Sequence, residues 1–220
     1  MPEDTQTAGF VLSGTRLSVR QILKQHTTPM HRQLDSLPAL RALLKPALSL
    51  SDYCRTLSGF ALAHESLEGD HWSLETTLAL GKVPTYTTRL PALKHDLCEL
   101  SLGQLTGIPH SVPALDRKRR RISTEWQYWG SRYVLEGATQ GSKFIALQLR
   151  KHLPQLVPRA FEFWETQLRL AQEWLLVCDH LSQICPEGDA KQQLLEGADI
   201  VFSTFSSCFA SIEGYRENNV

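Results

Sequence analysis

The chain has 220 residues, and its 23 Lys and Arg side chains are balanced by 23 Asp and Glu. This neutral balance argues against a general nucleic-acid-binding protein, which needs an excess of cations to neutralise phosphates. The sequence contains no run of about 20 apolar residues, so no membrane span is predicted. The opening MPEDTQTAGF lacks a signal-peptide pattern. The five cysteines are scattered and never form Cys-x-x-Cys, so we expect reduced thiols in a cytoplasmic protein.

Apolar residues recur at helical spacing along the chain and predict an all-α protein without strands. Residues 1–15 are polar and contain glycine, so we expect a flexible tail ahead of one helical domain at 16–220. The first helix is predicted over Leu17–Leu37. Pro29 should kink or break it near Thr27–Thr28, because proline cannot donate a backbone hydrogen bond and disfavours a helical residue before it.

Further helices are predicted in the middle of the chain. The pair Ser51-Asp52 is typical of an N-cap and should open a helix that runs to about Leu67. A short helical turn is expected before it, and two helical pieces after it: Ala39–Leu44, Trp72–Leu80 and Pro91–Leu102.

The second half of the chain predicts three longer helices. A basic run at 117–121 leads into a proline-free segment, Ile122–Arg150, which we expect to be one long helix. An amphipathic pattern covers 159–184, and a last helix is predicted over Ala190–Glu213. Seven or eight helices in one domain are therefore expected.

Three glycines mark the long predicted helix. Each interior glycine costs about 1 kcal/mol relative to alanine, yet Gly130, Gly137 and Gly141 all lie within this segment. At about 100° per residue they fall within about 20° of one line, which leaves a stripe of bare backbone. Two interpretations remain open: close packing of another helix, or contact with a flat ligand.

One histidine has neighbours that favour iron ligation. Asp35 lies four residues after His31, where its carboxylate can accept a hydrogen bond from one imidazole nitrogen and leave the other free for a metal. Lys24 lies two helical turns earlier, about 10 Å away, at a distance that suits a heme propionate. A heme ligand is thus a hypothesis, against the alternative of an ordinary core or surface histidine.

Two motifs give the chain a family resemblance. The segment H-T-T-P-M-H-R-Q-L-D at 26–35 and the segment Y-V-L-E-G-A-T-Q-G at 133–141 resemble heme oxygenases. The sequence is most similar to bacterial, biliverdin-producing members that supply bacteriophytochromes, and the resemblance extends over about residues 16–215. It implies a multi-helix bundle with heme between a proximal and a distal helix.

The resemblance also implies roles for individual residues. His31 matches the proximal iron ligand, Asp35 the acid that orients it, and Lys24 a base that pairs with a propionate. Gly137 and Gly141 match the distal-helix glycines that let heme and oxygen lie close, and these two are the expected catalytic positions. The remaining expected heme contacts are Tyr133, Phe202 and Phe209.

The implied activity is oxidative ring opening of heme, which is both cofactor and substrate. The products would be biliverdin, carbon monoxide and iron, made with O2 and electrons from a donor such as ferredoxin, flavodoxin or a reductase. A bacteriophytochrome that receives biliverdin is a further expected partner. Neither a nucleic acid nor a membrane is expected to take part.

Three positions depart from the family pattern. Gln140 stands where bacterial relatives are usually apolar, Ser142 where many have a second glycine, and Ala138 where animal-type enzymes have an aspartate. These departures keep open an alternative function, a heme- or tetrapyrrole-binding protein of the same fold that does not open the ring.

Two weaker signals complete the sequence reading. His64 and His71 are seven residues apart, but the paired Glu-x-x-His motifs of a di-iron site do not recur. The basic run at 117–121 is interpreted as a solvated helix start, or alternatively as a docking patch for an acidic electron donor.

Overall fold

The computed structural model describes residues 17–102 and 120–217. The predicted tail at 1–15 and the part of the basic run at 117–119 lie outside these described residues. Within them the chain is helical and has no strand, which confirms the all-α fold class. The elements are α1 (Val19–Asp35), α2 (Pro38–Ala42), α3 (Leu50–Glu75), α4 (Leu90–Leu102), α5 (Glu125–Gly137), α6 (Thr139–His152), the 3-10 helix η1 (Pro154–Leu156), α7 (Glu162–Leu170), α8 (Glu173–Gln183) and α9 (Gly188–Glu217).

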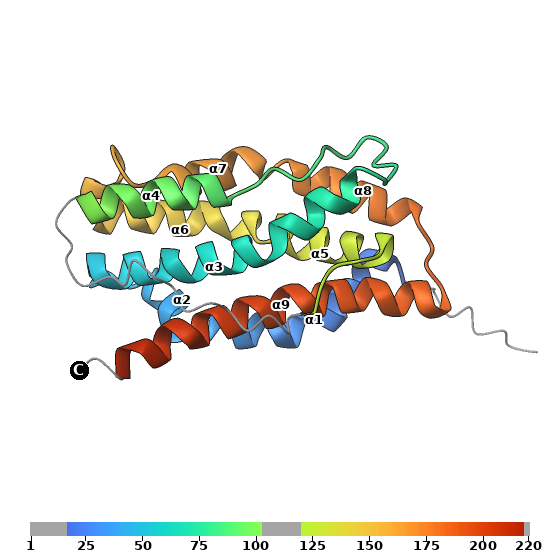
Figure 1. The fold of residues 1–220 in the computed structure, drawn as a ribbon, viewed down its shortest axis with the longest axis horizontal. Coiled ribbons are helices and arrows are strands. Elements are labelled where there is room, and N and C mark those ends of the chain that lie inside the picture. The colour runs from blue at the N-terminus through green and yellow to red at the C-terminus, as the bar shows by residue number, and fades with distance from the viewer. Residues whose placement is uncertain (1–16, 103–119, 218–220) are drawn as a thin grey trace, which may run out of the picture.

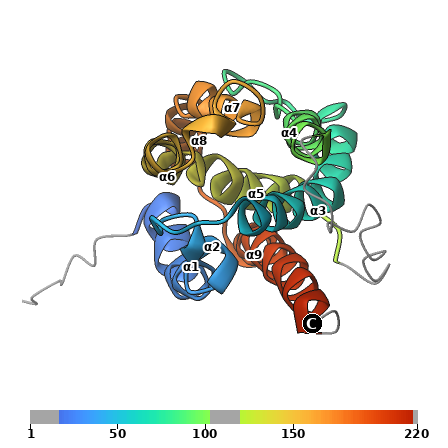
Figure 2. The same ribbon diagram turned by 90° about the vertical axis from the view of Figure 1, so that its left-hand side faces the viewer.

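The helices form a bundle around α5. In the end-on view of Figure 2, α5 lies in the middle, with α7 and α8 above it and α1, α2 and α9 below. In both views α6 lies above α1, on the same side of the bundle (Figures 1 and 2). The helices that carry His31 and Gly141 therefore lie on one side of the bundle. Among the described helices, none combines the length and apolar character that crossing a membrane requires.

Two apolar clusters hold the bundle together. The larger joins α1, α3, α5, α8 and α9 through side chains such as Leu23, Trp129 and Phe209, each at most 1% exposed. The second joins α3, α4, α6 and α7 around Tyr53 and Trp164, whose indole N–H donates to the Tyr53 hydroxyl at 3.0 Å. Burying each such side chain stabilises the fold by about 1.5–3 kcal/mol. Helix α3 contributes to both clusters and so links the two halves of the bundle.

Helix α1 continues through Pro29, so the proline does not break it. The hydroxyls of Thr27 and Thr28 donate to the carbonyls of Leu23 and Lys24, at 2.8 and 2.6 Å. These bonds add to the helix hydrogen bonds in the turn before the proline, which cannot donate one of its own. The helix also starts with a capping box between Ser18 and Gln21, which fixes its N-terminus.

Helix α3 is longer than predicted at both ends. Its N-cap is Ser49, whose hydroxyl accepts from the amide of Asp52 at 3.0 Å, so the helix begins before the predicted Ser51-Asp52 cap. It ends at Glu75, so it includes Trp72, which the sequence reading placed in a separate helix. The cause is the similarity of two candidate caps, since serines stand at both positions.

The predicted single helix over Ile122–Arg150 is wrong, because α5 ends at Gly137 and α6 begins at Thr139. The Thr139 hydroxyl donates to the Glu136 carbonyl at 2.6 Å, a local bond that competes with continued helix geometry. Glycine at 137 lowers the cost of a change in backbone direction. The amphipathic segment 159–184 likewise divides into α7 and α8.

Gly130 confirms the packing interpretation for one end of the glycine stripe. A Cβ on Gly130 would lie 1.8 Å from the carbonyl oxygen of Leu194 on α9, and one on Gly197 would lie 2.0 Å from that of Gln127 on α5. The two helices thus cross in backbone contact through a reciprocal pair of glycines. Any larger residue at this crossing would force α5 and α9 apart.

Candidate functional site

His31 lies exposed on α1 with one ring nitrogen engaged. Its Nδ1 is 2.8 Å from the Asp35 carboxylate, and the two side chains are 64% and 62% exposed. A carboxylate only accepts, so Nδ1 carries the proton and donates, which leaves the lone pair of Nε2 free for a metal. Lys24 is also exposed on α1, about 10 Å along the helix from His31. The structure thus brings together the three predicted residues on this helix.

The two predicted phenylalanines of α9 lie in different surroundings. Phe202 is 5% exposed, and its ring meets the His31 imidazole edge-on with centroids 6.3 Å apart. Phe209 is fully buried, with its ring 5.3 Å from that of Phe60 and tight against Gly59. Phe202 is therefore placed to support the imidazole, whereas Phe209 fills the core between α3 and α9.

An apolar, open surface covers α6, and we name it the Gly141 face after its central residue. No described atom lies within 4 Å of the position that a Cβ on Gly141 would occupy. Phe144 and Leu147, on the following turns, are 56% and 53% exposed. Large apolar side chains beside bare backbone are typical of a surface that a flat apolar ligand covers. This face belongs to the helix that lies above α1 (Figure 2).

Gly137, one turn before Gly141, is covered by a residue that the sequence reading did not assign to the site. The indole of Trp174 on α8 lies 3.4 Å from the position of a Gly137 Cβ. The ring of Tyr133 is 5.0 Å from the indole, and the Arg20 guanidinium is 5.8 Å from it. Burial raises the pKa of the half-buried Tyr133, so its hydroxyl stays protonated. The bare backbone predicted for all three glycines is thus found at Gly141 alone.

The two polar departures, Gln140 and Ser142, both donate hydrogen bonds to backbone carbonyls. The Gln140 amide donates to the carbonyl of Ala171, after α7, at 2.9 Å and to the Thr139 hydroxyl at 3.2 Å. Ser142 is 2% exposed, and its hydroxyl donates to the Ala138 carbonyl at 3.2 Å. Both polar groups are therefore satisfied by contacts that hold α6 in place.

Helix α5 also carries part of a buried ionic cluster. Arg89, Arg132 and Glu136 are all 0% exposed. Glu136 accepts from Arg89 and lies 3.2 Å from Arg132, which also reaches Glu75 on α3 at 3.3 Å. Breaking such a buried pair by removing one partner typically costs about 3–5 kcal/mol. The cluster thus fixes α5 against α3 and the segment that leads into α4.

His64 and His71 are core residues of α3. His64 pairs with Glu68 at 3.1 Å, and the His71 ring nitrogens contact the Leu67 carbonyl and the Ser131 hydroxyl at 3.1 and 2.8 Å. Burial lowers the pKa of His71 to about 4, so it is neutral near pH 7. Across the described residues, no group of three or more His, Cys, Asp and Glu side chains is placed to hold a metal ion.

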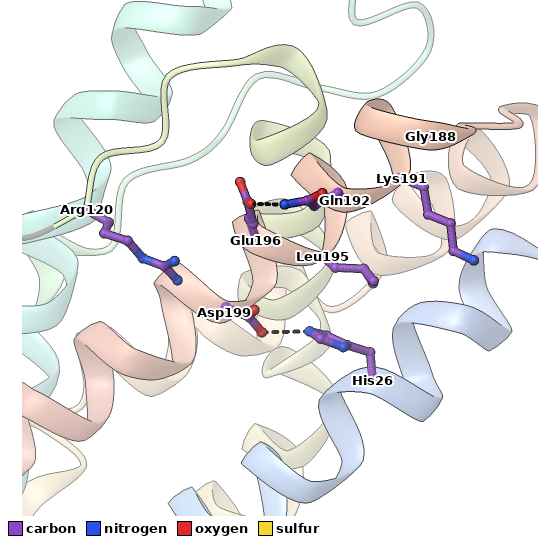
Figure 3. Close-up of a pocket in the computed structure, with 8 residues that line it drawn as sticks. All are labelled: His26, Arg120, Gly188, Lys191, Gln192, Leu195, Glu196 and Asp199. Atoms are coloured by element: carbon purple, nitrogen blue, oxygen red, sulfur yellow. Dashed lines mark hydrogen bonds and ion pairs between the residues drawn. The ribbon is translucent and has the colours of Figure 1, made fainter.

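The described part of the basic run, Arg120 and Arg121, has two different environments. Arg121 pairs with Asp70 on α3 through two nitrogens, at 3.0 and 2.8 Å. Arg120 instead lines a surface cavity of about 510 Å³ beside the N-terminal part of α9 (Figure 3). In this cavity His26 of α1 contacts Asp199 at 2.7 Å. His26 lines this cavity and His31 does not. The two residues are five apart, so their side chains point about 140° apart around α1.

Sequence reasoning missed the contributions of α8 and of the open side of α6. Trp174 fits the apolar stripe of its own helix, and nothing in its spacing indicates that it reaches Gly137. Phe144 and Leu147 offered a signal, because they follow Gly141 by three and six residues and lie on nearby turns. Within the ionic cluster, Arg132 and Glu136 are four residues apart and could be paired from helical spacing, whereas Arg89 and Glu75 could not, since they lie far away in the chain.

Comparison with known proteins gives consistent results. A family model described as heme oxygenase matches residues 17–211. A relative named heme oxygenase, from Xanthomonas campestris pv. campestris (strain 8004), is 32% identical over 126 residues, which are 57% of this chain and 70% of the relative. The structure of heme oxygenase from Leptospira interrogans is similar with a TM-score of 0.63, covering 88% of this chain and 98% of that chain. Its sequence identity is 18%, so this likeness concerns the fold.

Proposed function

Because this chain belongs to the heme oxygenase family, we propose that it binds heme between α1 and α6, with His31 as the axial ligand of the iron. The protein is an enzyme that degrades heme, and heme is both its cofactor and its substrate. The finer proposal is that O2 and electrons from a donor open the ring to biliverdin, carbon monoxide and iron.

The geometry of His31 is the observation that carries this proposal. The Asp35 carboxylate 2.8 Å from Nδ1 fixes the tautomer and orients the ring, and Phe202 packs against the ring from α9. A single imidazole with a free Nε2 fits a metal whose other ligands come from a porphyrin. Lys24, on the same helix, would pair with a propionate carboxylate.

The residues of the opposite helix fit the other face of such a ligand. The missing Cβ of Gly141 leaves room for a flat ring, and Phe144 and Leu147 present apolar contacts beside it. Bound heme would supply the iron that activates O2 and the ring that is cleaved. The chain would contribute ligation, close backbone approach and exclusion of water.

The alternative of a binding protein without ring opening rests on Gln140 and Ser142. Both side chains donate hydrogen bonds to backbone carbonyls, so we propose that neither prevents ring opening. Ala138 offers no carboxylate, so a water network near the iron would depend on backbone groups.

We propose the partners and the compartment from the family and from the cysteines. We place the reaction in the cytoplasm of a bacterial cell, with electrons from a ferredoxin, flavodoxin or reductase and biliverdin passed to a bacteriophytochrome. All five cysteines are free thiols, which fits a reducing compartment.

The test compares two histidines of α1. Hemin titration of His31→Ala should show loss of the iron–imidazole signature in the absorption and resonance Raman spectra, with unchanged helical circular dichroism. Added imidazole should restore the ligand signature by diffusing to the iron. His26→Ala is the matched control, because His26 pairs with Asp199 away from the Gly141 face and should leave the spectrum unchanged. An unaltered axial-ligand signature in His31→Ala would refute the assignment.

A further inference from the structure

Trp174 lies where three helices meet, at the end of α5. Its indole covers the backbone of Gly137, with the nearest ring atom 3.4 Å from the position of a Cβ. The Tyr133 ring of α5 packs against it at 5.0 Å, and the Arg20 guanidinium of α1 lies 5.8 Å from the ring centroid. One side chain from α8 thus contacts α1 and the end of α5, directly before α6 begins at Thr139.

The surroundings change completely between Gly137 and Gly141. The first glycine is covered by the indole, whereas no described atom lies within 4 Å of a Cβ on the second. Four helical residues correspond to a rise of about 6 Å. The backbone open to a flat ligand therefore begins just after Gly137, and Trp174 forms its boundary on the α8 side.

The chemistry on the two sides of this boundary differs. The indole is a large apolar surface, and the Arg20 cation already lies over it. Lys24 is exposed, and no ion pair engages it among the described residues. By helical geometry it lies one turn after Arg20 and about 40° further round α1. A heme has a hydrocarbon edge and an edge with two carboxylates. A carboxylate against the indole would compete with the ring for the Arg20 cation, whereas beside Lys24 it meets a cation that no described ion pair engages.

We propose that Trp174 fixes the orientation of heme within its own plane and thereby selects the meso carbon at which the ring is opened. This inference rests on the proposed function, heme bound between α1 and α6. Trp174 excludes the rotated orientations that would bring a propionate against Gly137 and favours the one with the carboxylates toward Lys24. Apolar contacts of this size discriminate by about 10- to 200-fold, enough to make one biliverdin isomer dominant.

The experiment compares Trp174→Ala with Trp72→Ala. Trp72 is 76% exposed on α3, so its variant controls for loss of an indole outside the site. Product isomers are separated by chromatography after turnover with a reductase and catalase. A second measurement does not need turnover: proton NMR of the ferric cyanide complex, in which the heme methyl shifts report the orientation of heme relative to the axial imidazole.

The parent protein and Trp72→Ala should each give one dominant isomer and one set of methyl resonances. Trp174→Ala should give a second isomer, raised about tenfold or more, and a second set of resonances. Trp174→Leu keeps an apolar cover on Gly137 without the ring and serves if the alanine variant loses its helical signal. Identical isomers and resonances in the parent and in a folded Trp174 variant would overturn the inference. A parent protein that fails to bind hemin would overturn the proposed function itself, and this inference with it.

Discussion

Gly130 and Gly141 belong to one predicted glycine stripe, yet the structure places them in opposite environments. At Gly130 the backbone of α9 lies so close that a Cβ would overlap the Leu194 carbonyl oxygen at 1.8 Å. At Gly141 the same added atom would meet no described atom within 4 Å. The first glycine is required by helix packing, whereas the second gives α6 no packing benefit that offsets its cost to helix stability.

The break at Ala138 explains how glycines of one sequence stripe come to lie in two different environments. Because α5 ends there and α6 begins at Thr139, residues before and after the break need not share one line. The α5 glycine contacts α9 inside the bundle, whereas no described atom lies within 4 Å of a Cβ on the α6 glycine. A helix glycine whose loss of helix stability is not offset by close packing is typical of a functional position. We therefore propose Gly141 as the residue that approaches the distal side of heme.

The largest effect should come from alanine at the packed glycine. Gly130→Ala should lower the free energy of unfolding by about 3 kcal/mol or more, since the contact is with backbone and cannot relax by a rotamer change. Gly141→Ala is the matched comparison and should raise stability by about 0.5–1 kcal/mol through helix propensity. Urea unfolding followed by circular dichroism measures both. Equal changes in the two variants would contradict the contrast.

A larger side chain at the open glycine should affect function and spare the fold. Gly141→Leu should keep the unfolding midpoint of the parent within a few degrees. Heme turnover should fall by about 100-fold, because a branched side chain would fill the space needed by ring and oxygen. Gly69→Leu, at an α3 glycine that is also open, controls for leucine in an exposed helix. Single-turnover absorption spectroscopy decides the point, and parent-like turnover in Gly141→Leu would remove heme from this face.

The smallest effect is expected for the two polar departures next to Gly141. The double variant Gln140→Leu with Ser142→Gly should keep heme turnover within about twofold of the parent, because both side chains are engaged in hydrogen bonds to backbone carbonyls. Stability should fall by about 1–2 kcal/mol, from the lost hydrogen bond to Ala171 and the added interior glycine. Biliverdin yield and urea unfolding provide the two readouts. A large gain in yield would show that these residues restrain the chemistry.

The sequence predicted the N-terminal site better than the distal one. His31, Asp35 and Lys24 lie within two turns of one helix, so helical spacing alone placed them on a common surface. Phe202 and Phe209 fit the expected spacing equally well. Phe202 contacts His31, however, whereas Phe209 fills the core beside Phe60. Spacing fixes which residues share a helix face. It does not say what that face contacts.

The sequence by itself determined the all-α class, most helix positions and the imidazole–carboxylate pair, because these depend on periodicity and on residues four apart. Only the tertiary structure decided that Gly130 packs on α9, that Trp174 covers Gly137 and that Gly141 stays open. It also assembled Arg89, Arg132 and Glu136 into one buried cluster. Contacts between segments far apart in the chain depend on how whole helices cross, and no local pattern records that geometry.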